Sequence, residues 1–298
     1  MTKRSNDWGN AMVRAGWQSN RKTQTLVKHG ASYVLLLIGG VLFLLPFFWQ
    51  ITTSLKTSAD TVLYPPVLVS NPLQWQNYAT LFERFPFGQY IVNSSLVTSL
   101  VIIGTVMSNS LAAYGFARLR MPGRDLIFIL LLSTLMLPGI VLIIPQFVLY
   151  SRLQWINTYY PLILPAFFGN AFYLFLMRQF LLTLPHELED AAKMDGAGYL
   201  RTYAQIILPQ ALPVILAVVL YAFVATWNDF LSPLIYLSEK ELYTLPVALR
   251  YLAGGIRNRP EYHLLMAAST LSILPCIVLF VIAQRWFIQG TVVSGVKG

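Results

Sequence analysis

Carboxylates gather in one short stretch of this chain, where Glu187, Glu189 and Asp190 are followed by Lys193 and Asp195. Ionised carboxylates only accept hydrogen bonds, so such a group suits the arginine side chains or backbone N–H groups of a partner protein. An amphipathic connector lying on lipid headgroups is the alternative. Connectors of that kind favour Lys and Arg on the polar face, because the leaflet is anionic. The acidic balance therefore favours a protein partner.

The sequence lacks the usual motifs for phosphate chemistry and metal binding. No Gly-x-x-x-x-Gly-Lys-Ser/Thr pattern occurs, so the chain has no phosphate-cradling loop of its own. His29, His186 and His263 are scattered, and no His-Glu-x-x-His pattern or cysteine cluster suggests a metal. We expect a non-catalytic chain without a metal or a cofactor.

One carboxylate, Asp229, lies inside an otherwise apolar stretch, where a charge is costly unless it is paired or hydrated. With Trp227 and Asn228 it could line a substrate path, since an aromatic face beside polar acceptors suits a sugar. Alternatively, Asp229 bonds to a neighbouring helix and only fixes packing. Asn109 and Tyr114 are weaker candidates for the same path, because polar residues often join membrane helices.

Long charge-free windows place these residues in a membrane. Of the 298 residues, 56% are hydrophobic and 11% are charged, whereas a soluble domain carries roughly 25% charged residues. Each window approaches or exceeds the ~18–20 residues that cross the bilayer as a helix. We expect an all-α integral membrane fold of six transmembrane helices, at about 30–51, 90–117, 126–150, 159–182, 211–237 and 264–288.

The basic residues indicate the orientation of the chain. The net charge is +9, and its cations cluster before the first expected span and in the loop that holds Arg118, Arg120 and Arg124. The positive-inside rule then places the N-terminal segment 1–29, this loop and the tail 291–298 in the cytoplasm, around a membrane domain 30–290. Nucleic-acid binding is disfavoured, because the cations flank membrane spans.

The acidic stretch reads as a helix–turn–helix over 185–210, between the fourth and fifth spans. Acidic residues in the first turn suit the helix dipole, and Gly196 and Gly198 permit a positive φ where the first helix ends. An apolar face of Leu200, Tyr203, Ala204 and Ile207 predicts the second helix.

This insert resembles the cytoplasmic EAA loop of permease subunits of binding-protein-dependent ABC importers. The family pattern is Glu-Ala-Ala, three residues, Gly, nine residues, Ile-x-Leu-Pro. Here Asp190-Ala191-Ala192 is followed at the same spacings by Gly196 and by Ile206 to Pro209. Asp190 replaces the usual Glu, and Glu189 stands beside it, so either carboxylate could make the main contact.

Further segments resemble permeases of sugar importers, and the C-terminal tail resembles the second permease of maltose-type importers. They run from Leu111 to Arg124, Trp227 to Leu234, Leu242 to Pro246 and Gln284 to Gly290, and the chain ends in Gly295-Val-Lys-Gly298. The resemblance implies a multi-pass protein of a bacterial or archaeal plasma membrane, with both termini cytoplasmic and a sugar-type substrate. It does not name the sugar.

The resemblance also implies partners and site residues. The loop would be a coupling helix that docks on a separate ATPase, through Glu189, Asp190, Ala191, Ala192, Asp195, Gly196, Leu208 and Pro209. The tail would reach the ATPase through Gly295, Lys297 and Gly298. Expected partners are a homologous second permease, two ATP-binding subunits that hold ATP and Mg, an extracytoplasmic solute-binding protein and the lipid bilayer. Two alternatives are an ion-coupled secondary transporter with Asp229 as its coupling carboxylate, and a scaffold without transport.

Overall fold

A computed structural model describes the backbone of residues 6–254 and 261–294 and the side chains of 29–30, 32–254 and 261–284. This part of the chain is helical and contains no strand. The α-helices are α1 Asn6–Ser54, α2 Gln76–Arg84, α3 Phe87–Arg118, α4 Arg124–Ser133, α5 Ile143–Arg152, α6 Tyr160–Ile163, α7 Ala171–Leu182, α8 Glu187–Met194, α9 Tyr199–Thr202, α10 Leu208–Gln210, α11 Leu212–Trp227, α12 Leu231–Tyr236, α13 Leu245–Ala253 and α14 Tyr262–Ser294. Short 3₁₀ segments are η1 Thr134–Met136, η2 Gly139–Leu142, η3 Leu164–Phe168 and η5 Lys240–Leu242, and η4 Tyr203–Ile207 is a π-helix.

Four helical segments among the described residues are long and apolar enough to cross a membrane: Ser32–Ser54, Phe87–Arg118, Tyr160–Leu182 and Tyr262–Gln284. Two further pairs pass the same test together but are bent, by 90° between Met136 and Gly139 and by 77° between Gln210 and Leu212. Counting each bent pair as one span gives up to six. The expected all-helical membrane fold is therefore confirmed, with four to six spans.

Proline explains the sharper bend. Leu137 is extended, with φ −81° and ψ 118°, and Pro138 follows it. A proline disfavours helical geometry in the preceding residue and cannot donate to the helical ladder. The expected span 126–150 is thus two helices at a steep angle. The expected span 211–237 is also interrupted, because α11 ends at Trp227 and α12 begins at Leu231.

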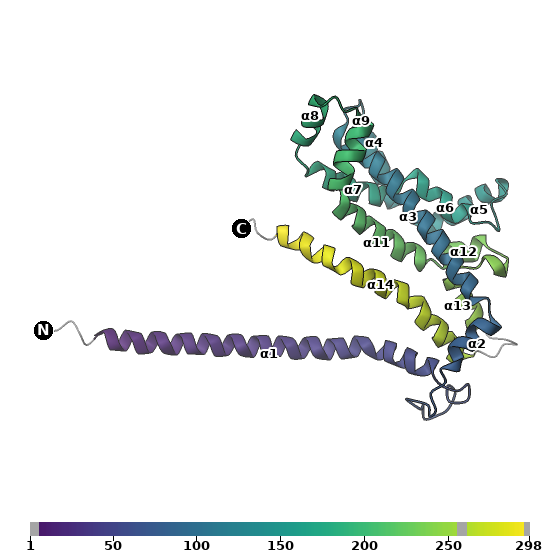
Figure 1. Cartoon of the computed structure of the whole chain (residues 1–298), viewed down its shortest axis with the longest axis horizontal. Helices are drawn as coiled ribbons and strands as arrows, with labels where there is room; N and C mark the ends of the chain where they lie inside the picture. Colours follow the sequence, from purple (N-terminus) through teal and green to yellow (C-terminus); the bar gives the residue numbers. More distant parts are fainter. Residues whose placement is uncertain (1–5, 255–260, 295–298) are drawn as a thin grey trace.

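Helix α3 lies at the centre of the bundle, beside α7 and α11 (Figure 1). Gly104 permits the close approach of η3 to α3, since a Cβ there would lie 2.6 Å from Cδ2 of Phe167. Helix α1 stands apart from the bundle and packs against α14 near its own C-terminal end (Figure 1).

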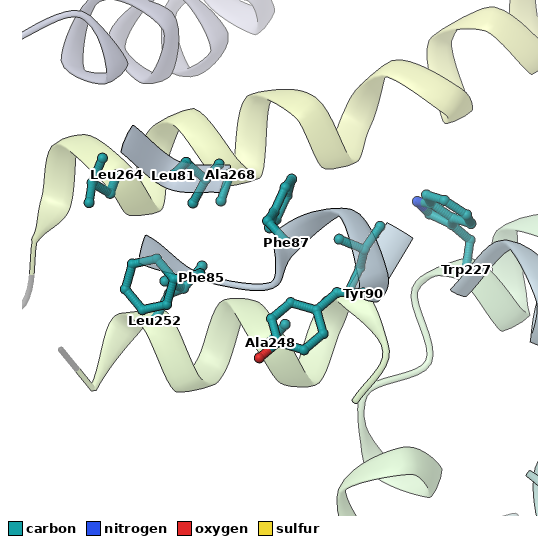
Figure 2. Close-up of a cluster of buried hydrophobic side chains, with 10 residues drawn as sticks. Leu81, Phe85, Phe87, Tyr90, Trp227, Ala248, Leu252, Leu264 and Ala268 are labelled. Atoms are coloured by element: carbon teal, nitrogen blue, oxygen red, sulfur yellow. The ribbon is translucent and has the colours of Figure 1, made fainter. Parts of the chain in front are cut away.

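Two apolar clusters mark the two ends of the bundle. At one end, Phe87 and Tyr90 of α3 pack with residues of α2, α13 and α14 (Figure 2). At the other end, Ala113 and Tyr114 of α3 pack against α7, η4 and α11. Consequently 52–86 and 238–254 gather at the first end, whereas 119–123 and 183–210 gather at the second (Figure 1).

Candidate functional site

The turn after α8 depends on a glycine. Gly196 has φ +75°, and its backbone N–H donates to the carbonyl of Lys193 at 3.0 Å. Ala197 N–H then donates to Ala192 O at 2.9 Å, which closes the end of the helix. Gly198 was expected to share this role, but its φ of −76° is accessible to any residue. The left-handed turn therefore requires glycine at position 196 and not at 198.

The second half of the insert differs from its prediction. Only α9 and the short α10 are α-helical, and the π-helix η4 lies between them. Pro209 cannot donate to the carbonyl of Gln205, which removes one bond of a regular helix at this point. The expected apolar face is wrong, since Ile207 is 1% exposed but Leu200 is 73% exposed. Among the expected coupling residues, Leu208 is half-buried and Pro209 is exposed.

The base of the insert is held by Arg118, at the end of α3. Its buried guanidinium donates from Nη2 to the carbonyls of Leu181, at 2.5 Å, and Leu184, at 2.7 Å. Nη1 lies 2.9 Å from His186 Nδ1, and Nε lies 3.5 Å from Glu189 Oε1. One side chain thus ties α3 to the end of α7 and to α8. The sequence showed Arg118 only as a loop cation, because its partners become neighbours only in the fold.

The structure separates the two candidate carboxylates. Glu189 is buried against Arg118, whereas the Asp190 side chain is 71% exposed and lies 3.3 Å from Lys193 Nζ. Ala192, which also belongs to α8, is buried as well. We call the insert 185–210 the elbow, and we call seven of its exposed residues the elbow tip: Asp190, Ala191, Met194, Asp195, Gly196, Tyr199 and Leu200. Three of them are large and apolar, and exposed apolar side chains grouped beside charges mark an interaction surface.

Asp229 lies at the break between α11 and α12. Its Oδ1 accepts a hydrogen bond from the backbone N–H of Ser232 at 3.2 Å, so the carboxylate supports the start of α12. The same side chain lines a cavity of about 400 Å³ and a smaller one of about 70 Å³. The larger cavity lies between the segment 139–150, the segment 161–165 and α12. Asp229 is therefore available to a molecule in either cavity.

The other expected path residues line neither cavity. Trp227 belongs to the core cluster of Figure 2, where Nε1 donates to Ser272 O at 3.0 Å and the ring stacks on Phe223 with centroids 5.4 Å apart. Asn228 is exposed and donates to Val224 O at 2.8 Å. The structure gives both residues local roles in packing and helix termination.

Asn109 and Tyr114 also have structural partners. Asn109 is fully buried, donates to Thr105 O at 2.7 Å and accepts from Asn170 N–H at 2.8 Å. It thereby fixes the junction between η3 and α7. Tyr114 lies in the cluster near the insert, its ring centroid 5.5 Å from that of Tyr203.

Two other expectations concern the tail and metals. Gly295, Lys297 and Gly298 lie outside the described residues. Among the side chains that the structure describes, no group of three or more His, Cys, Asp or Glu could hold a metal ion.

Comparison with known proteins decides the family. Residues 104–293, more than half of the chain, match the family described as "Binding-protein-dependent transport system inner membrane component". The chain belongs to this family.

This chain has curated relatives that are permease proteins. It is 31% identical over 268 residues to the sn-glycerol-3-phosphate transport system permease protein UgpE of Yersinia pestis, covering 88% of this chain and 95% of the relative. It is 34% identical to the arabinooligosaccharides transport system permease protein AraQ of Bacillus subtilis, covering 87% and 92%. It is 31% identical to the trehalose/maltose transport system permease protein MalG of Thermococcus litoralis, covering 89% and 97%.

A solved structure shares the fold of this inner membrane component. It belongs to a bacterial ABC transporter involved in the import of the acidic polysaccharide alginate, with a TM-score of 0.77, 21% identity, and coverage of 86% of this chain and 95% of that one. Together these likenesses establish a multi-pass membrane protein of the permease type, and its relatives are transport components and not enzymes.

Proposed function

We propose that this chain forms one side of the membrane pathway of an ATP-driven importer for a sugar or a sugar-like solute. The geometry of the elbow carries the proposal. Its base is bonded to α3 through Arg118, and its tip exposes Asp190 and apolar side chains to a partner. When a partner displaces the elbow tip, the rigidly held base can pass that displacement on to the helices of the bundle. The relatives' names support a transport role and a carbohydrate-like cargo.

The partners follow from this role. A second, homologous permease completes the pathway, two ATP-binding subunits bind ATP and Mg, and a solute-binding protein delivers the cargo from outside. The elbow tip docks on an ATP-binding subunit, with Asp190 as the main acceptor because Glu189 is already paired with Arg118. The tail residues Gly295, Lys297 and Gly298 form a second contact with the same subunits. The elbow end of the bundle is cytoplasmic, as its cations Arg118, Arg120 and Arg124 suggest.

Crosslinking tests the elbow contact. In a Cys276→Ser background, Ala191→Cys on the elbow tip should form a crosslink to a nucleotide-hydrolysing subunit in native membranes. Glu239→Cys is the matched control, because this exposed residue lies in the loop after α12, at the opposite end of the bundle. Failure of Ala191→Cys to reach such a subunit, with both variants present in the membrane, would refute the docking proposal.

A further inference from the structure

The two cavities beside Asp229 are lined by uncharged side chains apart from Asp229 itself. Within the described part of the chain, their lining contains no Lys, Arg or His, and Asp229 is the single carboxylate. The lining therefore offers one carboxylate to a molecule in the cavities and no basic side chain to pair with it.

The remaining polar groups of the lining are neutral. Gln146, Tyr150, Ser232 and Tyr236 line the larger cavity, and Ser94, Thr98, Thr226 and Thr244 line the smaller one. Thr244 is 4% exposed, and its Oγ1 has no hydrogen-bond partner among the described residues. A buried hydroxyl without a partner is unfavourable, so this group is suited to bond to a molecule that enters the cavity.

Aromatic rings form part of the same wall. Tyr150 and Tyr236 meet edge to face with ring centroids 5.3 Å apart. Phe147 and Trp155 stack on them, at 6.5 Å and 5.7 Å respectively, which holds both tyrosines in place. Rigid rings with polar tips offer apolar contact and hydrogen bonds together, a combination that suits a ring carrying many hydroxyl groups.

A negative charge on the solute would make its contact with Asp229 unfavourable. Oδ1 of Asp229 accepts from Ser232 N–H, but an ionised carboxylate has about four acceptor positions and can also receive solute hydroxyls. A phosphate or carboxylate brought close to Asp229 would be repelled, and away from bulk water that repulsion is strong. Such a like-charge contact is a means of rejecting a competitor.

On the basis of the proposed import function, we propose that the cavities beside Asp229 accept an uncharged polyhydroxylated solute and reject solutes that carry phosphate or carboxylate. The inference separates this chain from two of the proteins it resembles. The relative named for sn-glycerol-3-phosphate and the structural neighbour involved in alginate import have anionic cargo, whereas those named for arabinooligosaccharides and for trehalose and maltose have neutral cargo.

Uptake from a mixture tests the cargo class. Host cells with the gene deleted, and the same cells complemented with it, receive maltose, arabinotriose, glycerol 3-phosphate and an alginate-derived oligouronate. Loss of each solute from the medium is followed by mass spectrometry. Complementation should restore the uptake of a neutral solute alone. Restored uptake of an anionic one would overturn the inference while supporting the import function. No gene-dependent uptake at all would refute the import function and the inference with it.

Charge removal tests the role of Asp229. Asp229→Asn keeps an oxygen that can accept from Ser232 N–H but removes the charge. Uptake of the identified neutral sugar is then competed with its uronic acid counterpart. The binding protein is the same in both strains, so any difference arises in the permease. The uronic acid should inhibit the variant at a roughly tenfold lower concentration than the original protein.

Glu239→Gln is the control for this competition, because it removes an exposed carboxylate that lines neither cavity. It should leave the inhibition unchanged. Asp229→Ser provides a second neutral variant if Asp229→Asn fails to reach the membrane. Equal inhibition of the original protein and of an inserted neutral variant would overturn the inference.

Discussion

Two adjacent carboxylates, Glu189 and Asp190, have opposite environments. Glu189 points inward to Arg118, and Asp190 points outward beside Lys193. Breaking a buried ion pair by removing one partner typically costs about 3–5 kcal/mol, whereas an exposed pair contributes about 0–1 kcal/mol. Asp190 is thus free to serve a partner at little cost to the fold, and Glu189 is not.

We expect Asp190→Ala to lower ATP-driven uptake by roughly tenfold or more, because a hydrogen bond to a charged group contributes about 1.5–3 kcal/mol. The amount of inserted protein should not change, since the side chain is exposed. Lys193→Ala removes the other half of the surface pair and should leave uptake near normal. Full uptake by Asp190→Ala would show that this carboxylate does not carry the contact.

Gly196 and Gly198 provide a second comparison between near neighbours. Gly196→Asp should abolish uptake while the protein remains inserted, because φ is +75° and a side chain would also project from the elbow tip. Gly198→Ala should be tolerated, since φ there is −76° and an added Cβ has no neighbour within 4 Å. Uptake assays with membrane blots would measure both. Normal uptake by Gly196→Asp would contradict the docking of the elbow tip.

At the scale of the elements, the junction of α3, α7 and α8 depends on one guanidinium. Arg118→Lys keeps the charge but loses the planar set of donors that reaches two carbonyls and His186. Hydrogen exchange in α8 should become faster, and solute-stimulated ATP hydrolysis by the assembled complex should fall while basal hydrolysis persists. Arg120→Lys, in the exposed turn that follows, is the control. Unchanged exchange in α8 would mean that Arg118 does not hold the elbow.

The elements also show what the sequence could predict. Charge-free windows indicated the membrane helices, because a long apolar run in a bilayer must satisfy its backbone hydrogen bonds internally and therefore forms a helix. The interruption at Leu137 and the π-turn at η4 were not predicted, since prolines are common in membrane helices and do not reveal their local geometry. The inward turn of Glu189, the cavity around Asp229 and the burial of Trp227 depend on contacts between segments far apart in the chain. Periodicity within one segment contains no information on such contacts.

At the scale of the whole molecule, the same helices join the elbow to the cavity. Helix α3 has Arg118 at one end and the cavity residues Ser94 and Thr98 toward the other. Helix α11 begins after the elbow and ends two residues before Asp229. A displacement of the elbow can therefore reach the cavity wall through α3 and through α11.

This arrangement predicts the energy source. Vesicles that contain the complete complex should accumulate solute only when ATP and the ATPase subunit are both present. A proton gradient alone should drive no uptake, because the elbow and not the titration of Asp229 would supply the motion. Uptake that follows the gradient without ATP would favour an ion-coupled carrier instead.

The pairing of α1 with α14 has a consequence for biosynthesis. Gln50 Nε2 donates to Thr270 Oγ1 at 3.3 Å, and these residues are 220 positions apart. At a synthesis rate of about 5–20 residues per second, α1 waits roughly 10 to 40 s in the lipid before its neighbour emerges from the ribosome. Ribosome stalling ahead of α14 would leave the first helix in the membrane without this partner.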